Sequence, residues 1–295
     1  MKQALAAGVG GSLRSSDFEM SDRDFKDIAA MLYADAGIYM PESKTTLVYS
    51  RLVKRLRALN LASFRDYCDL VGSSQGSGER LEMLSALTTN VTRFFREPHH
   101  FEHLRDRVLP PLLESARRGG RVRLWSAACS TGPEPYSMAL TVLSLEPNAA
   151  SLDVRILASD IDPRVVEEGR RGVYPAAALA EAPAALYKRH FTVFGGDERR
   201  GLQASEELRR LVVFRTLNLN AAWPMPGKFH AIFCRNVVIY FDEQTQQTVW
   251  SKFADKLERD GILYIGHSER VTGPATARFV SDDVTAYRLK DGAGA

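Results

Sequence analysis

The sequence is poor in cysteine and has no long hydrophobic run. Its 295 residues include only Cys68, Cys129 and Cys234, and no CxxC pair. That scarcity excludes a disulfide framework and a cysteine-based zinc site, and it is typical of a reducing cytoplasm. No stretch approaches the roughly 18–20 apolar residues that a membrane-spanning helix requires. We therefore expect a cytoplasmic protein that does not insert into a membrane.

The sequence also lacks an excess of charge of either sign. It contains 39 Lys and Arg against 36 Asp and Glu, a formal net charge of +3. A balance this close to zero argues against a protein that wraps nucleic acid. With 45% hydrophobic and 25% charged residues, the composition is that of an ordinary globular protein, and the length suits about two domains. We expect a monomer with no nucleic-acid partner.

The first third of the chain has a helical pattern and no strand-like alternation. Residues 1–20 are rich in Gly, Ser and Ala and contain no signal-peptide core, so we expect a disordered tail. Residues 21–90 should form an all-helical domain, in which Ser21 and Ser63 cap the first and third helices. The helices are expected at 22–36, 42–59, 63–71 and 79–90, with a loop at 72–78. Residues 91–120 should form a linker segment and a helix.

Residues 121–290 alternate apolar strands with helices. The strands are VRLWSAACS, VRILASDID, LVVFRTLN, HAIFCRNVVIYF and GILYIGHSE. The helices between them include EPYSMALTVLSLE, PRVVEEGRRG and TQQTVWSKFADKLERD. This alternation predicts an α/β domain with a parallel sheet that is covered on both faces. The interval 175–210 breaks the pattern and predicts an inserted helix and small β-subdomain, and FVSDDVTAYRL predicts a final antiparallel strand or hairpin.

Two acidic residues follow the first two strands, and the usual phosphate-binding loop is missing. The turn SAACSTGPEPYS contains small residues and Glu134 but no GxGxxG, so it suits a cationic ligand better than a diphosphate. An acid at the end of the second strand binds ribose hydroxyls in dinucleotide folds, and Asp160 stands there. Asp162 is better placed to start the next helix. A ribose and a cation without a phosphate cradle point to S-adenosylmethionine rather than NAD.

Five motifs, in order, resemble the CheR family of chemotaxis-receptor glutamate methyltransferases. They are LTTNVTRFFRE, WSAACSTGPEPYS, ASDID, FCRNVVIYFD and IGHSE, and the resemblance extends from about Phe25 to Leu289. It implies a helical N-terminal domain before a Rossmann-like methyltransferase domain with a small inserted β-subdomain. It also implies an enzyme that uses S-adenosylmethionine, without a metal, to form methyl esters on glutamate side chains of membrane chemoreceptors, with S-adenosylhomocysteine as product.

The resemblance assigns nine residues to the cofactor site. They are Asn90, Thr92 and Arg96 in the segment that joins the domains, Glu134 and Asp160 after the first two strands, Asn218 and Leu219 beside the adenine, and Arg235 and Asn236 after the fourth strand. The family pattern has an acid at position 133, where this chain has Pro133. Glu134 is therefore the only acid in that loop.

A glutamate substrate sets the expected mechanism. A carboxylate with the ordinary glutamate pKa of about 4.3 is already ionised at neutral pH, so it needs no general base to attack a methyl group on a sulfonium. Catalysis should consist of alignment and desolvation. Arg96 is a candidate to orient the incoming carboxylate, although it is equally suited to hold the carboxylate of the cofactor. Tyr240 is a candidate to hydrogen-bond the glutamate.

Receptor recognition is expected on the basic face of the 42–59 helix. Between Lys44 and Asp66 there are six basic residues and one acid, and this missing counter-charge favours an acidic partner such as a glutamate-rich methylation helix. The candidate receptor-binding residues are Lys44, Arg51, Lys54, Arg55 and Arg57. An ordinary solvated helix face is the alternative. The inserted β-subdomain could add a receptor tail as an extra strand, as it does in some members of the family, or merely cover the sheet.

Other interpretations stay open at this point. An NAD(P)-dependent oxidoreductase is disfavoured by the missing GxGxxG, and a non-catalytic adaptor by the intact motif residues. Phe94 and Phe95 are expected in the core, and Cys129 and Cys234 in packing rather than in catalysis. His99, His100 and His103 have helical spacing, which favours a packed or solvated helix face over a metal site. His267 follows a strand end and could face the site.

Overall fold

The computed structural model describes residues 18–180, 182–197, 199 and 201–290. They form two compact units, one with the chain up to Met31 and Pro41–Leu87, the other with Leu32–Met40 and the chain from Thr88 onward. The tail predicted at 1–20 lies outside the described residues as far as residue 17. None of the helices in the described part is long and apolar enough to cross a bilayer.

The N-terminal unit is all-helical, as predicted. Its helices are α1 (Asp22–Ala36), of which the residues from Leu32 belong to the larger unit, α2 (Thr45–Ala58), α3 (Phe64–Gly72) and α4 (Ser77–Leu87). Both predicted caps are confirmed, since the Ser21 hydroxyl accepts a hydrogen bond from the Asp24 N–H, and Ser63 does the same for Asp66. The apolar faces meet in a core that buries Ile28, Val48, Leu52, Leu56, Phe64, Tyr67, Val71 and Met83.

Several boundaries in this unit differ from the expected ones, and the helix expected to reach residue 90 ends at Leu87. The helix expected at 42–59 is divided into a 3-10 turn, Glu42–Lys44, and α2. The loop expected at 72–78 contains a second 3-10 turn, Ser74–Gly76, and α4 begins at Ser77. A Cβ on Gly76 would lie 1.9 Å from the carbonyl oxygen of Leu70, so the chain can turn this tightly only with glycine there.

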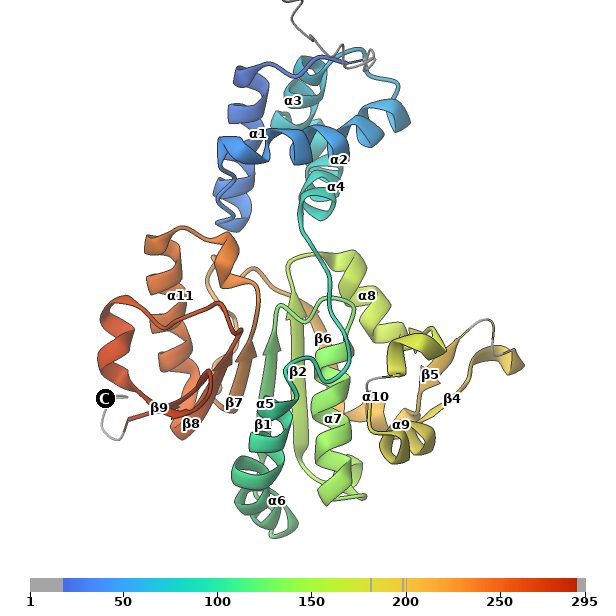
Figure 1. Cartoon of the computed structure of the whole chain (residues 1–295), viewed down its shortest axis with the longest axis vertical. Helices are drawn as coiled ribbons and strands as arrows, with labels where there is room; N and C mark the ends of the chain where they lie inside the picture. The colour runs from blue at the N-terminus through green and yellow to red at the C-terminus, as the bar shows by residue number, and fades with distance from the viewer. Residues whose placement is uncertain (1–17, 181, 198, 200, 291–295) are drawn as a thin grey trace, which may run out of the picture. The chain divides into compact units, whose positions relative to one another are not determined.

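The larger unit is built on a seven-stranded sheet in the order β6-β2-β1-β7-β8-β10-β9 (Figure 1). The parallel strands are β1 (Val122–Ala127), β2 (Val154–Asp160), β6 (Val212–Thr216), β7 (Phe229–Cys234) and β8 (Leu257–Ile265). The antiparallel hairpin is β9 (Phe279–Asp283) and β10 (Ala286–Leu289). The sheet and hairpin confirm the predicted fold class. Successive strands run outward from β1 to β6, and the chain then returns to β7 beside β1.

Helices cover both faces of this sheet. Since successive side chains along a strand point to opposite faces, each strand contributes to two separate cores. Leu124 points into the core that contains α7 (Pro133–Leu145) and α8 (Pro163–Arg171). Its neighbour Trp125 points into the opposite core, which contains α11 (Glu243–Lys256). The first core also includes α5 (Pro98–His103), α6 (Leu109–Arg117) and the π-helical turn between them, Leu104–Val108. The last expected helix ends earlier than predicted, because Leu257 already pairs with Phe229 in β8.

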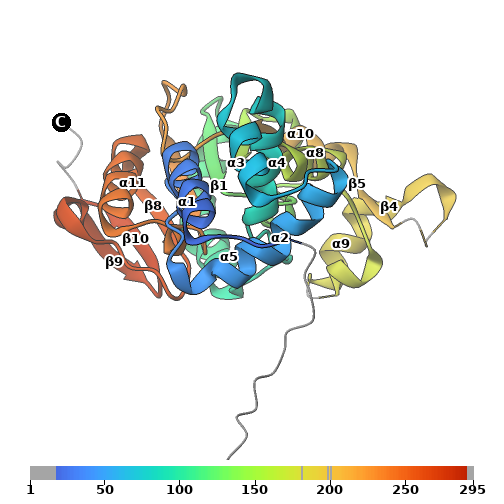
Figure 2. The ribbon, with the colours of Figure 1, turned by 90° about the horizontal axis from the view of Figure 1, so that it is seen from above.

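The predicted insertion is a three-stranded antiparallel sheet with two helices. Its strands are β3 (Val173–Tyr174), β4 (Phe191–Val193) and β5 (Leu202–Ala204), in the order β3-β5-β4, and its helices are α9 (Ala184–His190) and α10 (Glu206–Leu211). The small sheet begins two residues before the predicted boundary. It lies beyond the β6 side of the main sheet, on the side opposite to the β9–β10 hairpin (Figure 2). The ring of Phe94, in the segment before α5, packs against this small sheet, 5.0 Å from the Tyr174 ring.

Candidate active site

The strand order reverses between β1 and β7, and in open α/β sheets the ligand lies outside the carboxyl ends of the strands at such a point. The loops that leave these strands contain non-glycine residues with positive φ, namely Ala128 at 65°, Ser130 at 50° and Asn236 at 58°. Phe95 and Glu97, at 50° and 56°, have positive φ in the segment before α5. Such conformations cost about 1–3 kcal/mol each and concentrate at functional sites.

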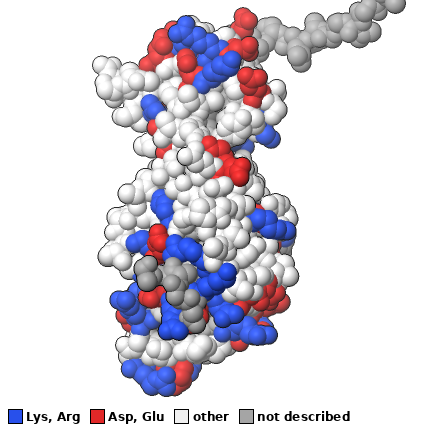
Figure 3. Space-filling view, turned by 90° about the vertical axis from the view of Figure 1, so that its left-hand side faces the viewer, with Lys and Arg blue, Asp and Glu red and all other residues white. Residues whose placement is uncertain are grey.

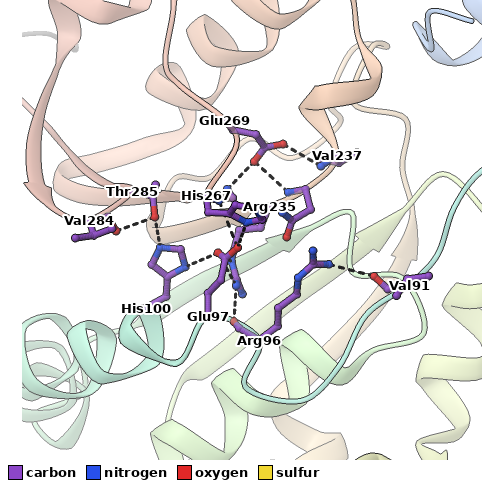
Figure 4. Close-up of polar contacts among 12 residues, drawn as sticks. Val91, Arg96, Glu97, His100, Arg235, Val237, His267, Glu269, Val284 and Thr285 are labelled. Atoms are coloured by element: carbon purple, nitrogen blue, oxygen red, sulfur yellow. Dashed lines mark hydrogen bonds and ion pairs between the residues drawn. The ribbon is translucent and has the colours of Figure 1, made fainter.

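Arg235, at the end of β7, connects these loops to the segment before α5. Its guanidinium is almost fully buried and pairs with Glu97 at 2.9 Å and with Glu134 at 3.1 Å. It also donates to the carbonyl oxygen of Arg96. The sequence predicted Arg235 at this strand end, and the structure adds that its charge is paired with two carboxylates of the protein. The Arg235 side chain therefore holds the segment before α5 against the sheet (Figure 4).

Glu97 was not predicted as a site residue, yet it interacts with Arg235 and with both the backbone and the ring of His267. Its carboxylate accepts hydrogen bonds from Arg235 and from the backbone N–H of His267, and it lies 2.9 Å from the His267 ring nitrogen Nδ1. Burial opposes ionisation of Glu97, but the charge of Arg235 and the hydrogen bonds outweigh it and lower the pKa of Glu97 to about 2. His267 thus faces the site, and its ring reaches Glu97 (Figure 4).

The Glu134 carboxylate has both oxygens engaged within the protein. One accepts from the Ser126 hydroxyl at 2.7 Å, and the other pairs with Arg235. Burial raises the pKa of Glu134, and the charge of Arg235 opposes that shift. Glu134 lies in the first turn of α7, which begins at Pro133 directly after the thin turn at the end of β1.

Asp160 ends β2 as predicted, and its carboxylate is 7% exposed. One oxygen accepts from the backbone N–H of Ser130 and the other from that of Asp162. Burial raises the pKa of Asp160, and these backbone hydrogen bonds oppose the shift. Asp162 caps α8 by accepting from the Arg164 N–H, which confirms its predicted role as a helix start. Because a carboxylate has about four acceptor positions, Asp160 retains capacity for ribose hydroxyls.

The segment 88–97 lies against the β1 and β2 strand ends. The Asn90 carbonyl accepts from the Ser130 hydroxyl at 2.9 Å, and the Asn90 amide is 3.5 Å from Asp162. Thr92 is half-buried, while Phe94 is fully buried and confirms its predicted place in the core. The Arg96 guanidinium donates to the carbonyl of Val91 and has no carboxylate partner among the residues that the structure describes.

Asn218 and Leu219 follow β6 and lie against the end of α1. The Asn218 amide donates to the carbonyl of Asp35, 2.5 Å away, in the same unit. Leu219 is buried, and its carbonyl accepts from the Lys252 ammonium at 2.7 Å. Lys252 also lies 4.2 Å from the centre of the Trp223 ring. Lys252, which the sequence analysis missed, therefore fixes the loop that carries these two candidates.

The loop after β7 is held by a second missed carboxylate, that of Glu269. This side chain accepts hydrogen bonds from the backbone N–H groups of Asn236, Val237, Val238 and Gly266. Burial raises the pKa of Glu269, and the four hydrogen bonds oppose the shift. The motif IGHSE pointed to this place, but the prediction singled out His267 instead.

Tyr240 lies on the same loop, in the 3-10 turn Val238–Tyr240, and is 37% exposed. Its backbone carbonyl accepts from the N–H of Tyr39, and the neighbouring Phe241 forms an antiparallel bridge with Ile38. The structure thus places Tyr240 four residues after Asn236 on a loop that is fixed at both ends.

The histidines and cysteines have the packing roles that were expected. His100 and His103 are buried, and their rings lie 2.8 Å from the hydroxyls of Thr285 and Tyr264. Cys129 and Cys234 are buried, and burial raises the pKa of each thiol well above its usual value. Across the described ranges, no group of three or more His, Cys, Asp or Glu is arranged to hold a metal ion.

The basic residues of α2 are less isolated than predicted. Arg55 forms a two-pronged ion pair with Glu79, at 2.9 and 2.6 Å, and reaches Glu82 at 3.3 Å. Arg51 donates to the carbonyls of Ala86 and Leu87. The prediction that this face lacks counter-charges is therefore wrong, because α4 supplies them. Acidic and basic side chains are intermixed on the face of the N-terminal unit at the top of Figure 3.

Other candidates on this face are accessible. Lys44, Lys54 and Arg57 are exposed. Lys44 and Lys54 form no ion pair with any residue in the described ranges. The receptor-binding assignment of α2 stays a prediction, and it now depends mainly on these two lysines.

The strand-end residues fit S-adenosylmethionine better than a dinucleotide. Asp160 offers acceptors for ribose hydroxyls, and Arg96 offers a guanidinium without an acidic partner to a carboxylate. The β1 turn contains Glu134 and two prolines where a diphosphate would need backbone N–H groups of a glycine-rich loop.

Comparison with known proteins supports the same ligand. The family description of the CheR methyltransferase SAM binding domain matches residues 90–287, and that of the CheR methyltransferase all-alpha domain matches residues 23–88. A probable chemotaxis protein methyltransferase of Rhizobium etli is 56% identical over 88% of this chain and 96% of its own length. The chemotaxis protein methyltransferase of Escherichia coli is 41% identical over 92% of each chain. Chemotaxis protein methyltransferase 2 of Pseudomonas aeruginosa is 43% identical over 86% of this chain and 89% of its own.

Proposed function

Because the chain belongs to the CheR methyltransferase family, we propose that it methylates glutamate side chains of membrane chemoreceptors, with S-adenosylmethionine as the methyl donor. The products are glutamate methyl esters and S-adenosylhomocysteine. The observation that carries this proposal is the guanidinium of Arg96, a half-buried residue beside Arg235, which has no carboxylate partner in the described part of the chain.

The residues of the chain position reactants rather than transfer protons. When bound, S-adenosylmethionine supplies a methyl group on a positively charged sulfur. The attacking glutamate, with an ordinary pKa of about 4.3, is ionised at neutral pH, so no base is needed. Alignment and desolvation can contribute about 7–11 kcal/mol. Arg96 binds a carboxylate, either that of the substrate or that of the cofactor, and the Tyr240 hydroxyl donates to the incoming glutamate.

The cofactor is held by residues from five segments. Asp160 accepts from the ribose hydroxyls, and Glu134 contributes negative charge beside the methionine ammonium. The remaining contacts come from Asn90 and Thr92 before α5, from Asn218 and Leu219 beside the adenine, and from Arg235 and Asn236 after β7. The two acidic partners of the Arg235 side chain limit the contacts that this side chain can make with the cofactor.

The partner is a cytoplasmic, glutamate-containing methylation helix of a chemoreceptor. Lys44 and Lys54 are exposed cations that suit such an acidic surface. The β-subdomain provides a second place, where a receptor tail pairs with a strand of the small sheet. The enzyme acts as a monomer in the cytoplasm.

Two measurements test the proposal. Calorimetry should detect binding of S-adenosylmethionine and S-adenosylhomocysteine but not of NAD, and receptor-containing membranes should acquire base-labile methyl groups.

Asp160→Ala should weaken the binding of both ligands by about 1.5–3 kcal/mol, the value of hydrogen bonds to a charged group. Arg96→Ala should lose methyl transfer while its melting temperature stays close to that of the wild type. Binding of NAD, or folded wild-type enzyme that methylates no receptor, would refute the proposal.

A further inference from the structure

Glu269 is a buried carboxylate whose partners lie in two strand-end loops. It is 4% exposed and stands shortly after the end of β8. Its Oε2 accepts from the N–H groups of Asn236 and Gly266, at 3.0 and 2.6 Å. Its Oε1 accepts from those of Val237 and Val238, at 3.0 and 2.9 Å. One side chain therefore holds three consecutive residues of the loop after β7 to the loop after β8.

The loop that Glu269 holds has a left-handed backbone conformation where it carries a candidate cofactor residue. Asn236 has φ of 58°, a conformation that is uncommon for residues with a side chain and that Asn tolerates better than most. Three successive N–H groups that converge on one point form an anion-binding concavity, and Glu269 fills it from within the chain.

Gly266 allows the two loops to approach each other. A Cβ at this position would lie 2.5 Å from the Asn236 amide nitrogen Nδ2, 2.9 Å from the Asn236 backbone nitrogen and 2.9 Å from Glu269 Oε2. Distances under 3.0 Å essentially do not occur for a real Cβ, so a larger residue would push the loops apart. Gly266 and Glu269 thus act together on the same loop, since Gly266 also donates its N–H to the Glu269 carboxylate.

We infer that Glu269 is a positioning residue for methyl transfer, which sets the conformation of the loop Asn236–Val238 and thereby the placement of Asn236 and Tyr240. Glu269 does not touch the reactants in this assignment. It acts through the backbone of the loop, and Gly266 assists by allowing the close approach. This inference rests on the proposed function for its catalytic part, whereas the effects on the loop and on cofactor affinity do not depend on the receptor.

Glu269→Gln is the sharpest test, because it keeps the shape of the side chain. Whichever way the new amide is turned, its NH₂ group faces two backbone N–H donors and disrupts half of the network. A loop displaced by about 1 Å can cost a factor of about 100 in rate. We expect kcat per folded molecule to fall about 10- to 100-fold and the Kd for S-adenosylhomocysteine to rise. The amides of 236–238 should exchange hydrogen faster than in the wild type.

Glu146→Gln is the matched control. Glu146 is 8% exposed, accepts from the Asn148 backbone N–H and pairs with Arg117, at the end of α7 remote in sequence from the strand-end loops. Its removal should lower the melting temperature but leave kcat, Kd and exchange at 236–238 unchanged. Gly266→Ala keeps the Glu269 side chain but adds a Cβ that presses on both the Asn236 loop and the Glu269 carboxylate. It should reproduce the kcat, Kd and exchange changes of Glu269→Gln even if the latter folds poorly.

The inference is overturned if folded Glu269→Gln and Gly266→Ala keep wild-type kcat, Kd and amide exchange, or if Glu146→Gln shows the same losses. A failure of the proposed function has a different signature. Wild-type enzyme would then bind S-adenosylhomocysteine without methylating receptors, and the Kd and exchange data of the variants would still decide the role of Glu269.

Discussion

At the scale of single residues, Arg235 makes the site depend on charge as well as on shape. It is a buried cation with two acidic partners whose side chains are each 12% exposed, and removal of one member of such a group leaves a poorly compensated charge. This explains why a residue predicted to line the site also determines where Arg96 lies. The cofactor residues before α5 are held through Glu97 and Arg235, rather than through apolar packing alone.

Glu97 gives this network a defined pH dependence. Burial opposes its ionisation, but Arg235 and His267 outweigh that effect, and the pKa of Glu97 in the folded protein is about 2. It is about 4.3 in an unfolded chain. A carboxylate whose pKa is lowered by folding stabilises the folded protein at pH values above its unfolded pKa. That stabilisation is lost as the pH falls toward 2. The shift corresponds to up to about 3 kcal/mol.

Urea unfolding of the wild type and Glu97→Gln between pH 6 and pH 3 tests this dependence. Tryptophan fluorescence reports on the larger unit alone, because Trp125, Trp223 and Trp250 all belong to it. The stability difference between the two proteins should be largest near pH 6 and should shrink as the pH falls. The exposed Glu114→Gln is the control and should differ little from the wild type throughout. A difference for Glu97→Gln that does not change with pH would contradict the assignment.

At the scale of elements, local signals predicted most of the fold. Ser21 and Ser63 cap the helices that they were expected to cap, and the apolar runs that end in SAACS and ASDID form adjacent parallel strands. Boundaries failed where tertiary contacts decide, as at the start of β8. The missed residues have partners far away in the sequence, since Glu97 and Arg235 are 138 positions apart. No local pattern encodes such a pair. The sequence therefore predicted that the candidate site lies at the strand ends, but not the ion pairs that hold its loops together.

Arg55 and Lys54 are adjacent cations on α2 with different expected roles. Arg55 pairs with Glu79, whose side chain is 8% exposed and also accepts from the Tyr67 hydroxyl. Arg55→Ala should therefore destabilise the N-terminal unit by about 2 kcal/mol, since the nearly buried acid loses its charged partner. The exposed Lys54→Ala should change stability by less than about 0.5 kcal/mol.

Hydrogen exchange of the α2–α4 amides measures these effects, because this unit contains no tryptophan. Equal protection in the two variants would mean that the Arg55–Glu79 pair adds nothing to stability. The comparison also separates the cations that support the fold from those available to a partner.

At the scale of the whole molecule, the net charge of +3 is too small to attract a receptor by itself, so any steering must come from local cations. Lys44 and Lys54 are exposed. Contacts between exposed charges weaken as the salt concentration rises, since the screening length is only about 10 Å at 0.1 M. Lys44→Ala combined with Lys54→Ala should raise the KM for receptor membranes roughly two- to thirtyfold at low salt, because each of the two exposed pairs contributes about 0.2–1 kcal/mol.

The matched control removes the exposed Lys188 and Arg189 of α9, which lowers the net charge equally but in the β-subdomain. Methylation rates are measured against salt for the wild type and both double variants. If α2 binds the receptor, the KM of the wild type should rise with salt concentration until it equals that of the α2 variant, whose KM depends less on salt. The KM of the α9 variant should then change with salt as that of the wild type does. If the α2 curve coincides with that of the wild type and the α9 curve departs, recognition belongs to the β-subdomain. Unchanged affinity for S-adenosylhomocysteine in both variants is required in either case, because neither substitution touches the strand-end loops.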